Sequence, residues 1–267
     1  MQIASPQSGQ GTDSHDSQSH TLQLFTLLTT LRPHWPGSLI LSCGLSPAGS
    51  DLALAANIAG AACLSIDQSP ETCRAALRYG LVDFVVNTLD EALRALKNEI
   101  RKGHPLSVAL QGHPATVLAE ALDRGVLPQL FTAFTYPSGG DTEPPERSVD
   151  TQPAQAFHAM GSLIVDFDGT LHSVPSALEA AKFLQIFNTE HDLAMEEFSF
   201  DSAGALRNFD AQVLEVIRSG DPRRRWATAA PRQFGRSRST GTRSHRRVLS
   251  LTPLEHGQLT RALHLTP

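Results

Sequence analysis

The feature that most constrains the fold is an alternation of short apolar runs with helical patterns between Ser38 and Phe134. The apolar runs have the length and composition of buried strands, and the segments between them have the apolar spacing of helices. The expected strands cover 38–43, 62–66, 83–86, 106–110 and 127–134, and the expected helices cover 51–61, 70–79, 89–102 and 114–124. Strands that alternate with helices form a parallel sheet with helices on both faces. We therefore predict an α/β fold with a Rossmann-like parallel sheet flanked by helices.

A glycine-containing turn follows the first expected strand. It begins at Gly44 and reaches Gly49, and the second expected strand ends directly on Asp67. In dinucleotide-binding domains, glycines after the first strand let the backbone approach the pyrophosphate, and a carboxylate about twenty residues further on binds the adenosine ribose. A carboxylate at this position also repels the 2′-phosphate of NADP. The spacing therefore predicts that the cofactor is NAD.

Further motifs follow in order through the same stretch. They are Gly44-Leu45, Gly49, Asn57 to Gly60, Cys63 to Asp67, Ser69-Pro70, Gly80 to Asp83, Thr88 to Ala92, Pro105 to Val108 and Leu110 to Gly112. Their order and spacing resemble the central Rossmann-like domain of urocanase (urocanate hydratase). The resemblance implies tightly bound NAD that acts as an electrophile: the imidazole ring of urocanate adds to the nicotinamide before water is added. It also implies a link to histidine degradation.

The resemblance implies a cofactor-binding role for six residues: Gly44, Leu45, Gly49, Asp67, Gly112 and His113. The two glycines of the turn stand where the family has phosphate-loop glycines, and the aspartate stands where it has the ribose-binding acid. His113 replaces the asparagine that members of the family usually carry. The alternative to a cofactor contact is that His113 is a surface residue at a helix start.

The chain departs from the family pattern in three places. The turn between Gly44 and Gly49 lacks several of the family's glycines, and residues 132–136 replace an Asp-Gln-Thr-Ser run. Asp51 places a carboxylate beside the start of the first expected helix, where it would compete with a phosphate for the same amide groups. For all these positions the alternative is a Rossmann-like domain that binds no dinucleotide.

Catalytic residues stay unassigned. Urocanases are considerably longer than this chain, and their downstream catalytic cysteine has no counterpart because no cysteine follows Cys73. Three interpretations remain open: a truncated or decayed urocanase paralogue that is inactive alone, a stand-alone NAD-binding relative, and a fragment whose tail is not in its native reading frame. The alternative from another class is a non-catalytic, decayed Rossmann module.

A second motif lies at residues 163–171 and resembles the first motif of haloacid-dehalogenase-type phosphatases. In that family Asp166 would accept the phosphoryl group and Asp168 would act as general acid, helped by magnesium. Such enzymes also need a distant lysine, and Lys182 is the only lysine after the motif. We favour a strand followed by a bend at residues 168–169, and we predict no metal site.

Composition divides the chain into five parts. We expect residues 1–20 to be disordered, 21–137 to form the Rossmann-like domain, 138–153 to be a linker, 154–217 to be a small α/β continuation and 218–267 to be a low-order, irregular Arg-rich tail. Between Arg218 and Arg247 lie ten of the 22 basic residues and a single acid, Asp221. Such a segment can attract polyanions. We expect its charge to be incidental, and nucleic acid is not the partner we predict.

The cysteines and the apolar runs bear on the compartment. Cys43, Cys63 and Cys73 lie within the Rossmann-like stretch, as reduced, buried thiols of a cytoplasmic protein would. Cys43 in particular is expected to be a packed strand residue. No apolar run approaches the roughly 20 residues that span a bilayer, so we predict no membrane partner. The resemblance to urocanases, which are dimers, implies a homodimer.

Overall fold

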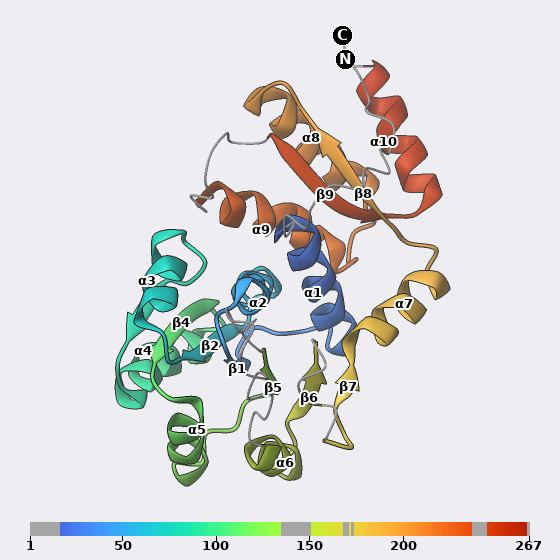
Figure 1. Cartoon of the computed structure of the whole chain (residues 1–267). Coiled ribbons are helices and arrows are strands. Elements are labelled where there is room, and N and C mark those ends of the chain that lie inside the picture. Colours follow the sequence, from blue (N-terminus) through green and yellow to red (C-terminus); the bar gives the residue numbers. More distant parts are fainter. Residues whose placement is uncertain (1–16, 135–150, 168–170, 172–173, 237–244, 266–267) are drawn as a thin grey trace, which may run out of the picture.

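The computed structural model describes residues 17–134, 151–167, 171, 174–236 and 245–265. These residues form a seven-stranded sheet with the strand order β3-β4-β2-β1-β5-β6-β7 and a separate two-stranded sheet, β8-β9 (Figure 1). Every neighbouring pair in the larger sheet is parallel. The predicted α/β fold with a Rossmann-like sheet is therefore confirmed.

The Rossmann-like part begins with a helix and then alternates strands and helices. Its elements are α1 (Ser17–Leu31), β1 (Leu39–Cys43), α2 (Pro47–Ala59), β2 (Ala62–Asp67), α3 (Pro70–Arg78), β3 (Phe84–Val86), α4 (Leu89–Lys102), β4 (Leu106–Gln111), α5 (Pro114–Asp123) and β5 (Leu130–Ala133). Two further strands extend the sheet beyond β5: β6 (Leu163–Asp166), which follows α6 (Thr151–Ala159), and β7 (Leu178–Glu179).

Helices cover both faces of the sheet. Alternate residues of a strand point to opposite faces, so Ile40 of β1 packs in the core under α1, α2 and α3, whereas Leu39 and Leu41 pack in the core over α4, α5 and α6. Helix α2 is buried on all sides from Gly49 to Ala59. This burial arises because α1 lies against its outer surface and the sheet against its inner surface.

Two helix starts show how local sequence sets the elements. Helix α4 begins where predicted, because Thr88 and Glu91 form a capping box: the Thr88 hydroxyl accepts from the Glu91 N–H at 3.3 Å, and the Glu91 carboxylate accepts from the Thr88 N–H at 3.1 Å. Helix α2 begins four residues before the expected Asp51. Ser46 caps it and Pro47 occupies its first position, so Gly49 lies inside the first turn rather than in a loop.

The ends of the chain differ from the sequence-based expectation. Residues 17–20, expected to be disordered, open helix α1, while residues 1–16 lie outside the described residues, as do 138–150 of the expected linker. In the small α/β continuation expected over 154–217, the helix that follows β7 begins at Ala180.

The low-order, irregular tail expected from Arg218 contains regular elements in the residues that the structure describes. After β7 the chain first forms α7 (Ala180–Glu190), β8 (Ala194–Ser199) and α8 (Ala203–Val216). The expected tail then contains α9 (Arg223–Arg236), β9 (Arg246–Leu251) and α10 (Pro253–Leu265). Tertiary contacts stabilise these elements. Trp226 is buried, its ring centroid lies 5.5 Å from that of Phe25 in α1, and its Nε1–H donates to the carbonyl oxygen of Val248. A local pattern does not reveal such partners.

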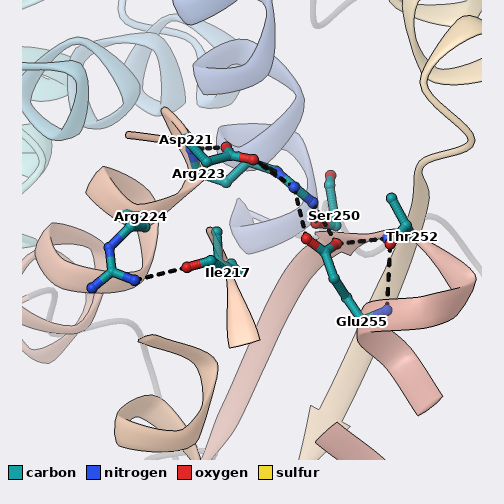
Figure 2. Close-up of polar contacts among 7 residues, drawn as sticks. All are labelled: Ile217, Asp221, Arg223, Arg224, Ser250, Thr252 and Glu255. Atoms are coloured by element: carbon teal, nitrogen blue, oxygen red, sulfur yellow. Dashed lines mark hydrogen bonds and ion pairs between the residues drawn. The ribbon is translucent and has the colours of Figure 1, made fainter. Parts of the chain in front are cut away.

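Several arginines of this segment bind acidic or carbonyl groups elsewhere in the described part of the chain. Arg223 lies at the centre of a cluster in which its guanidinium contacts Asp221, Glu255 and the carbonyl oxygen of Ser250 (Figure 2). Arg224 donates to the carbonyl oxygen of Ile217, beyond the end of α8, at 2.7 Å. These cations therefore join α8, α9, β9 and α10. The positive charge of the segment, expected from composition to be incidental, thus has a structural role.

No helix in the described part of the chain is both long and apolar enough to cross a membrane.

Candidate functional site

The carboxyl ends of β1, β2 and β4 bring five of the six predicted site residues to one edge of the sheet. Gly44 follows β1 and donates its N–H to the carbonyl oxygen of Ile66 at 2.7 Å. Gly112 follows β4 and donates to the carbonyl oxygen of Asp67 at 2.9 Å. The sixth residue, His113, is exposed at the start of α5 and its side chain forms no cap.

Asp67 connects the glycine turn to the start of α3. Its carboxylate accepts from the Leu45 N–H at 2.6 Å and from the Ser69 N–H at 2.8 Å, and the residue is only 1% exposed. Burial raises the pKa of Asp67, and the two backbone donors act in the opposite direction. The carboxylate therefore faces the turn in this conformation instead of the solvent, where a ribose would approach.

Both glycines of the turn are required by neighbouring backbone. Gly44 has a φ of +90°, which favours glycine, and a Cβ there would lie 2.7 Å from the carbonyl oxygen of Phe134. A Cβ on Gly49 would lie 2.1 Å from the carbonyl oxygen of Gly44. Gly49 therefore serves close packing of the helix on the strand and turn, which is one of the glycine roles known in dinucleotide-binding turns.

The carboxylate of Asp51 is directed at helix α1. It accepts from the hydroxyl of Ser17 at 2.6 Å and lies 3.0 Å from Nδ1 of His20, and the residue is 2% exposed. The carboxylate that the sequence places near the start of α2 is thus buried against α1 and contacts two of its side chains.

Phe134 is a site residue that sequence reasoning missed. It follows β5, donates its N–H to the carbonyl oxygen of Cys43 at 2.8 Å, and is 3% exposed. Its ring stacks on Phe167 with centroids 5.5 Å apart and planes 10° from parallel. The available signal was its position directly after the fifth strand, at the edge where the other site residues lie.

The three cysteines are free and buried. Burial, assisted by the negative charge of Asp67, raises the pKa of Cys43 to about 12. Burial also raises the pKa of Cys63 to about 11. These thiols are protonated at neutral pH, so they do not supply a thiolate nucleophile, and Cys43 is a packed strand residue as predicted.

The second motif is described only in part. Asp166 ends β6, is buried, and accepts from the Leu171 N–H at 3.2 Å, whereas Asp168 lies outside the described residues. Lys182 is exposed on α7, where its ammonium group pairs with Glu179 at 2.6 Å. Within the described ranges, no group of three or more His, Cys, Asp or Glu side chains has the arrangement of a metal site.

A cavity of about 390 Å³ lies at the other edge of the sheet. It is lined mainly by apolar side chains, among them Leu31, Leu163, Ile164 and Leu178. Because Leu163 opens β6, the cavity is near the amino end of that strand and is separate from the carboxyl-edge cluster.

The strand order and the glycine turn define this part of the chain as a Rossmann-like domain. Residues 24–138 match the family model of the urocanase Rossmann-like domain. The resemblance that the motifs of this segment show to the urocanase Rossmann-like domain is therefore confirmed.

The solved structures that the chain matches have low similarity to it. A short-chain alcohol dehydrogenase (rspB) from E. coli CFT073, complexed with NADH, is 10% identical with a TM-score of 0.31, and the match covers 64% of this chain and 46% of that one. Quinate dehydrogenase from Corynebacterium glutamicum, in complex with NAD, is 12% identical with a TM-score of 0.32, over 64% and 62% of the two chains. Human methyltransferase-like protein 13, in complex with SAH, is 11% identical with a TM-score of 0.33, over 95% and 93%. The chain thus spans less than two thirds of the length of either dehydrogenase, and scores this low support no functional argument.

Proposed function

We propose that the Rossmann-like part of this chain binds NAD at the carboxyl edge of its central strands. The observation that carries the proposal is the match of residues 24–138 to the urocanase Rossmann-like domain, combined with the placement of Gly44, Gly49 and Asp67 at one edge of the sheet. The residue types fit the cofactor: a glycine turn leads into the start of α2, where helix amides favour phosphate, and a carboxylate ends β2.

The space at this edge does not fit NAD in the conformation described. The carbonyl oxygen and ring of Phe134 lie against both glycines of the turn, and the Asp67 carboxylate is occupied by the Leu45 and Ser69 N–H groups. Binding therefore requires local movement of the turn and of Phe134, which lowers the apparent affinity.

The first test compares NAD with NADP by isothermal titration calorimetry. We expect NAD to bind more tightly, because the Asp67 carboxylate repels a 2′-phosphate and accepts ribose hydroxyl groups. Asp67→Asn should weaken NAD binding by about 1–3 kcal/mol, the scale of a hydrogen bond to a charged group, and should narrow the preference over NADP.

The matched control for this test is Asp90→Asn. Asp90 is an exposed carboxylate on α4 that pairs with Arg124, so its removal should leave both affinities unchanged. Equal affinity of the wild-type chain for the two dinucleotides would contradict the role of Asp67, and no binding of either would contradict the proposed function.

We further propose a connection with histidine degradation in which this chain does not hydrate urocanate by itself. The family's catalytic cysteine lies downstream of the NAD domain, whereas the last cysteine here is Cys73, which is buried. Orienting both reactants supplies about 7–11 kcal/mol of barrier lowering in favourable cases, and a cofactor site alone lacks most of it.

The measurement is the ultraviolet absorbance of urocanate in the presence of purified protein and excess NAD. We expect no change above the rate without protein. Sustained loss of absorbance that Gly49→Trp abolishes would contradict this proposal and would identify the chain as an enzyme.

We also propose that the protein acts in the cytoplasm as a homodimer. The three free thiols support a reducing compartment, and the dimeric state of urocanases supports self-association. Sedimentation velocity should give a dimer mass, and a monomer at all concentrations would contradict the assembly.

A further inference from the structure

The strand order places a topological switch point between β1 and β5. From β1 the chain runs to β2, β3 and β4 on one side, and it then crosses to β5 on the other side of β1 (Figure 1). In open parallel sheets, ligands bind in the crevice outside the carboxyl ends of the strands at such a point. The crevice at this position is therefore the place where a dinucleotide would cross the sheet.

Phe134 fills that crevice with groups of the chain itself. Its N–H bonds to Cys43 at the end of β1, and its carbonyl oxygen lies 2.7 Å from the position of a Cβ on Gly44. The ring atom Cδ2 lies 3.3 Å from the position of a Cβ on Gly49. Phe134 thus contacts both glycines of the turn and lies where the carboxyl ends of β5 and β1 meet.

A buried hydroxyl lies one step deeper on the same strand face. Thr132 and Phe134 share a face because alternate residues of a strand do, whereas Phe131 points to the opposite core. The Thr132 hydroxyl is fully buried and has no hydrogen-bond partner among the residues that the structure describes. A buried hydroxyl without a hydrogen-bond partner is unfavourable.

We propose that Phe134 is a plug that occupies the dinucleotide crevice in the ligand-free protein, and that the Thr132 hydroxyl bonds to the dinucleotide once the ring moves away. The inference rests on the proposed function, since it concerns the regulation of that same site. The plug lowers apparent affinity because only molecules with the ring displaced can bind. It also predicts that removing a protein side chain improves binding, which a simple contact residue would not do.

The experiment measures the NAD affinity of four chains by isothermal titration calorimetry: wild type, Phe134→Ala, Phe131→Ala and the double variant Phe134→Ala with Thr132→Val. Phe131→Ala is the matched control, because Phe131 is a buried phenylalanine of β5 whose ring lies tilted against that of Phe157 on the other face. Both alanine variants create a core cavity, but only one opens the crevice.

We expect Phe134→Ala to tighten NAD binding by about tenfold or more, in proportion to the fraction of molecules that become competent to bind. Phe131→Ala should leave the affinity close to that of the wild type. Adding Thr132→Val to Phe134→Ala should weaken binding again by about fivefold, the scale of one neutral hydrogen bond. Phe134→Leu, which keeps more buried apolar volume, should show the same direction with a smaller change if the alanine variant folds poorly.

The outcomes separate this inference from the proposed function. If the wild type binds NAD and Phe134→Ala binds equally or more weakly, the plug is overturned and the binding function stands. If the double variant matches Phe134→Ala, the role of Thr132 is overturned. If neither the wild type nor any Phe134 variant binds, both the plug and the proposed function are overturned. Binding by Phe134→Ala alone supports the plug, but it contradicts the proposed function for the wild-type chain.

Discussion

At the scale of single residues, Gly49 and Asp67 have structural roles that the dinucleotide-binding sequence motif does not indicate. The glycine admits the carbonyl oxygen of Gly44 into the space of its missing side chain, and the carboxylate holds the Leu45 N–H. A turn of this kind is stabilised by its own contacts before any ligand is present. Residues that match a cofactor motif therefore also decide whether the domain folds.

Gly49→Ala should destabilise the protein by about 1–3 kcal/mol, the scale of overpacking in a filled site. The added Cβ would lie 2.1 Å from a backbone oxygen that belongs to the same turn, so the helix must shift. Urea unfolding monitored by circular dichroism measures the change. Gly204→Ala in α8 is the control, because the nearest atom to its Cβ would be 3.7 Å away; equal stability of the two variants would show that the turn yields freely.

At the scale of elements, the Arg223 cluster joins the start of α9 to the start of α10 (Figure 2). Burial disfavours the charged guanidinium, but the hydrogen bonds to Asp221 and Glu255 outweigh it and raise the pKa of Arg223 further above its ordinary value. Burial likewise opposes the charge of Glu255, but the hydrogen bonds from Arg223 and Thr252 lower the pKa of Glu255 below its ordinary value. A partly buried pair of this kind depends on both charges.

This cluster predicts that α10 loosens in acid. Because the pKa of Glu255 is lower in the folded chain than in the unfolded one, its stabilisation is complete above the unfolded value and is lost as the pH falls through the folded value. Hydrogen exchange of α10 amides, corrected for intrinsic rates, should show constant protection well above about pH 4.3, the ordinary value for Glu. Below that pH the protection should fall by the equivalent of about 1–3 kcal/mol. Glu255→Gln should start with lower protection and vary less with pH, and an unchanged pH profile in that variant would exclude this carboxylate as the cause.

At the scale of the whole molecule, the C-terminal segment is part of the packing around α2. Arg225 of α9 donates to the carbonyl oxygen of Ile58 at 3.0 Å, and its guanidinium occupies the space where Gly60 has no Cβ. Trp226 packs on Phe25 of α1. Helix α2 thus has the glycine turn at its first end and α9 at its last, and α1 covers it between them (Figure 1).

Trp226→Ala should therefore destabilise the entire chain by about 3–5 kcal/mol, as truncation of a buried aromatic side chain does. The melting curve should keep a single transition at a lower temperature, because the tryptophan joins the C-terminal segment to α1. Phe84→Ala is the control, since Phe84 is 53% exposed on the edge strand β3. A separate early transition in Trp226→Ala, with the main one unmoved, would mean that the C-terminal segment folds independently.

The sequence by itself determined the alternating order of strands and helices from 38 to 134, the capped start of α4 at Thr88 and the resemblance of the Rossmann-like part to that of urocanase. These features depend on local periodicity, local capping and the order of motifs, all of which are present along the chain. Strand ends are readable in the sequence too: Gly44 follows the first expected strand and Asp67 ends the second.

Only the tertiary structure decided which atoms those residues contact. It turned Asp67 toward the Leu45 N–H, placed Phe134 against both glycines, and gave the arginines after Arg218 partners that convert an apparently low-order tail into helices and a strand. The physical reason is that burial and ion pairing join residues far apart in the chain. Local sequence carries the tendency to form an element, whereas the partner that stabilises it is set by the packing of the whole molecule.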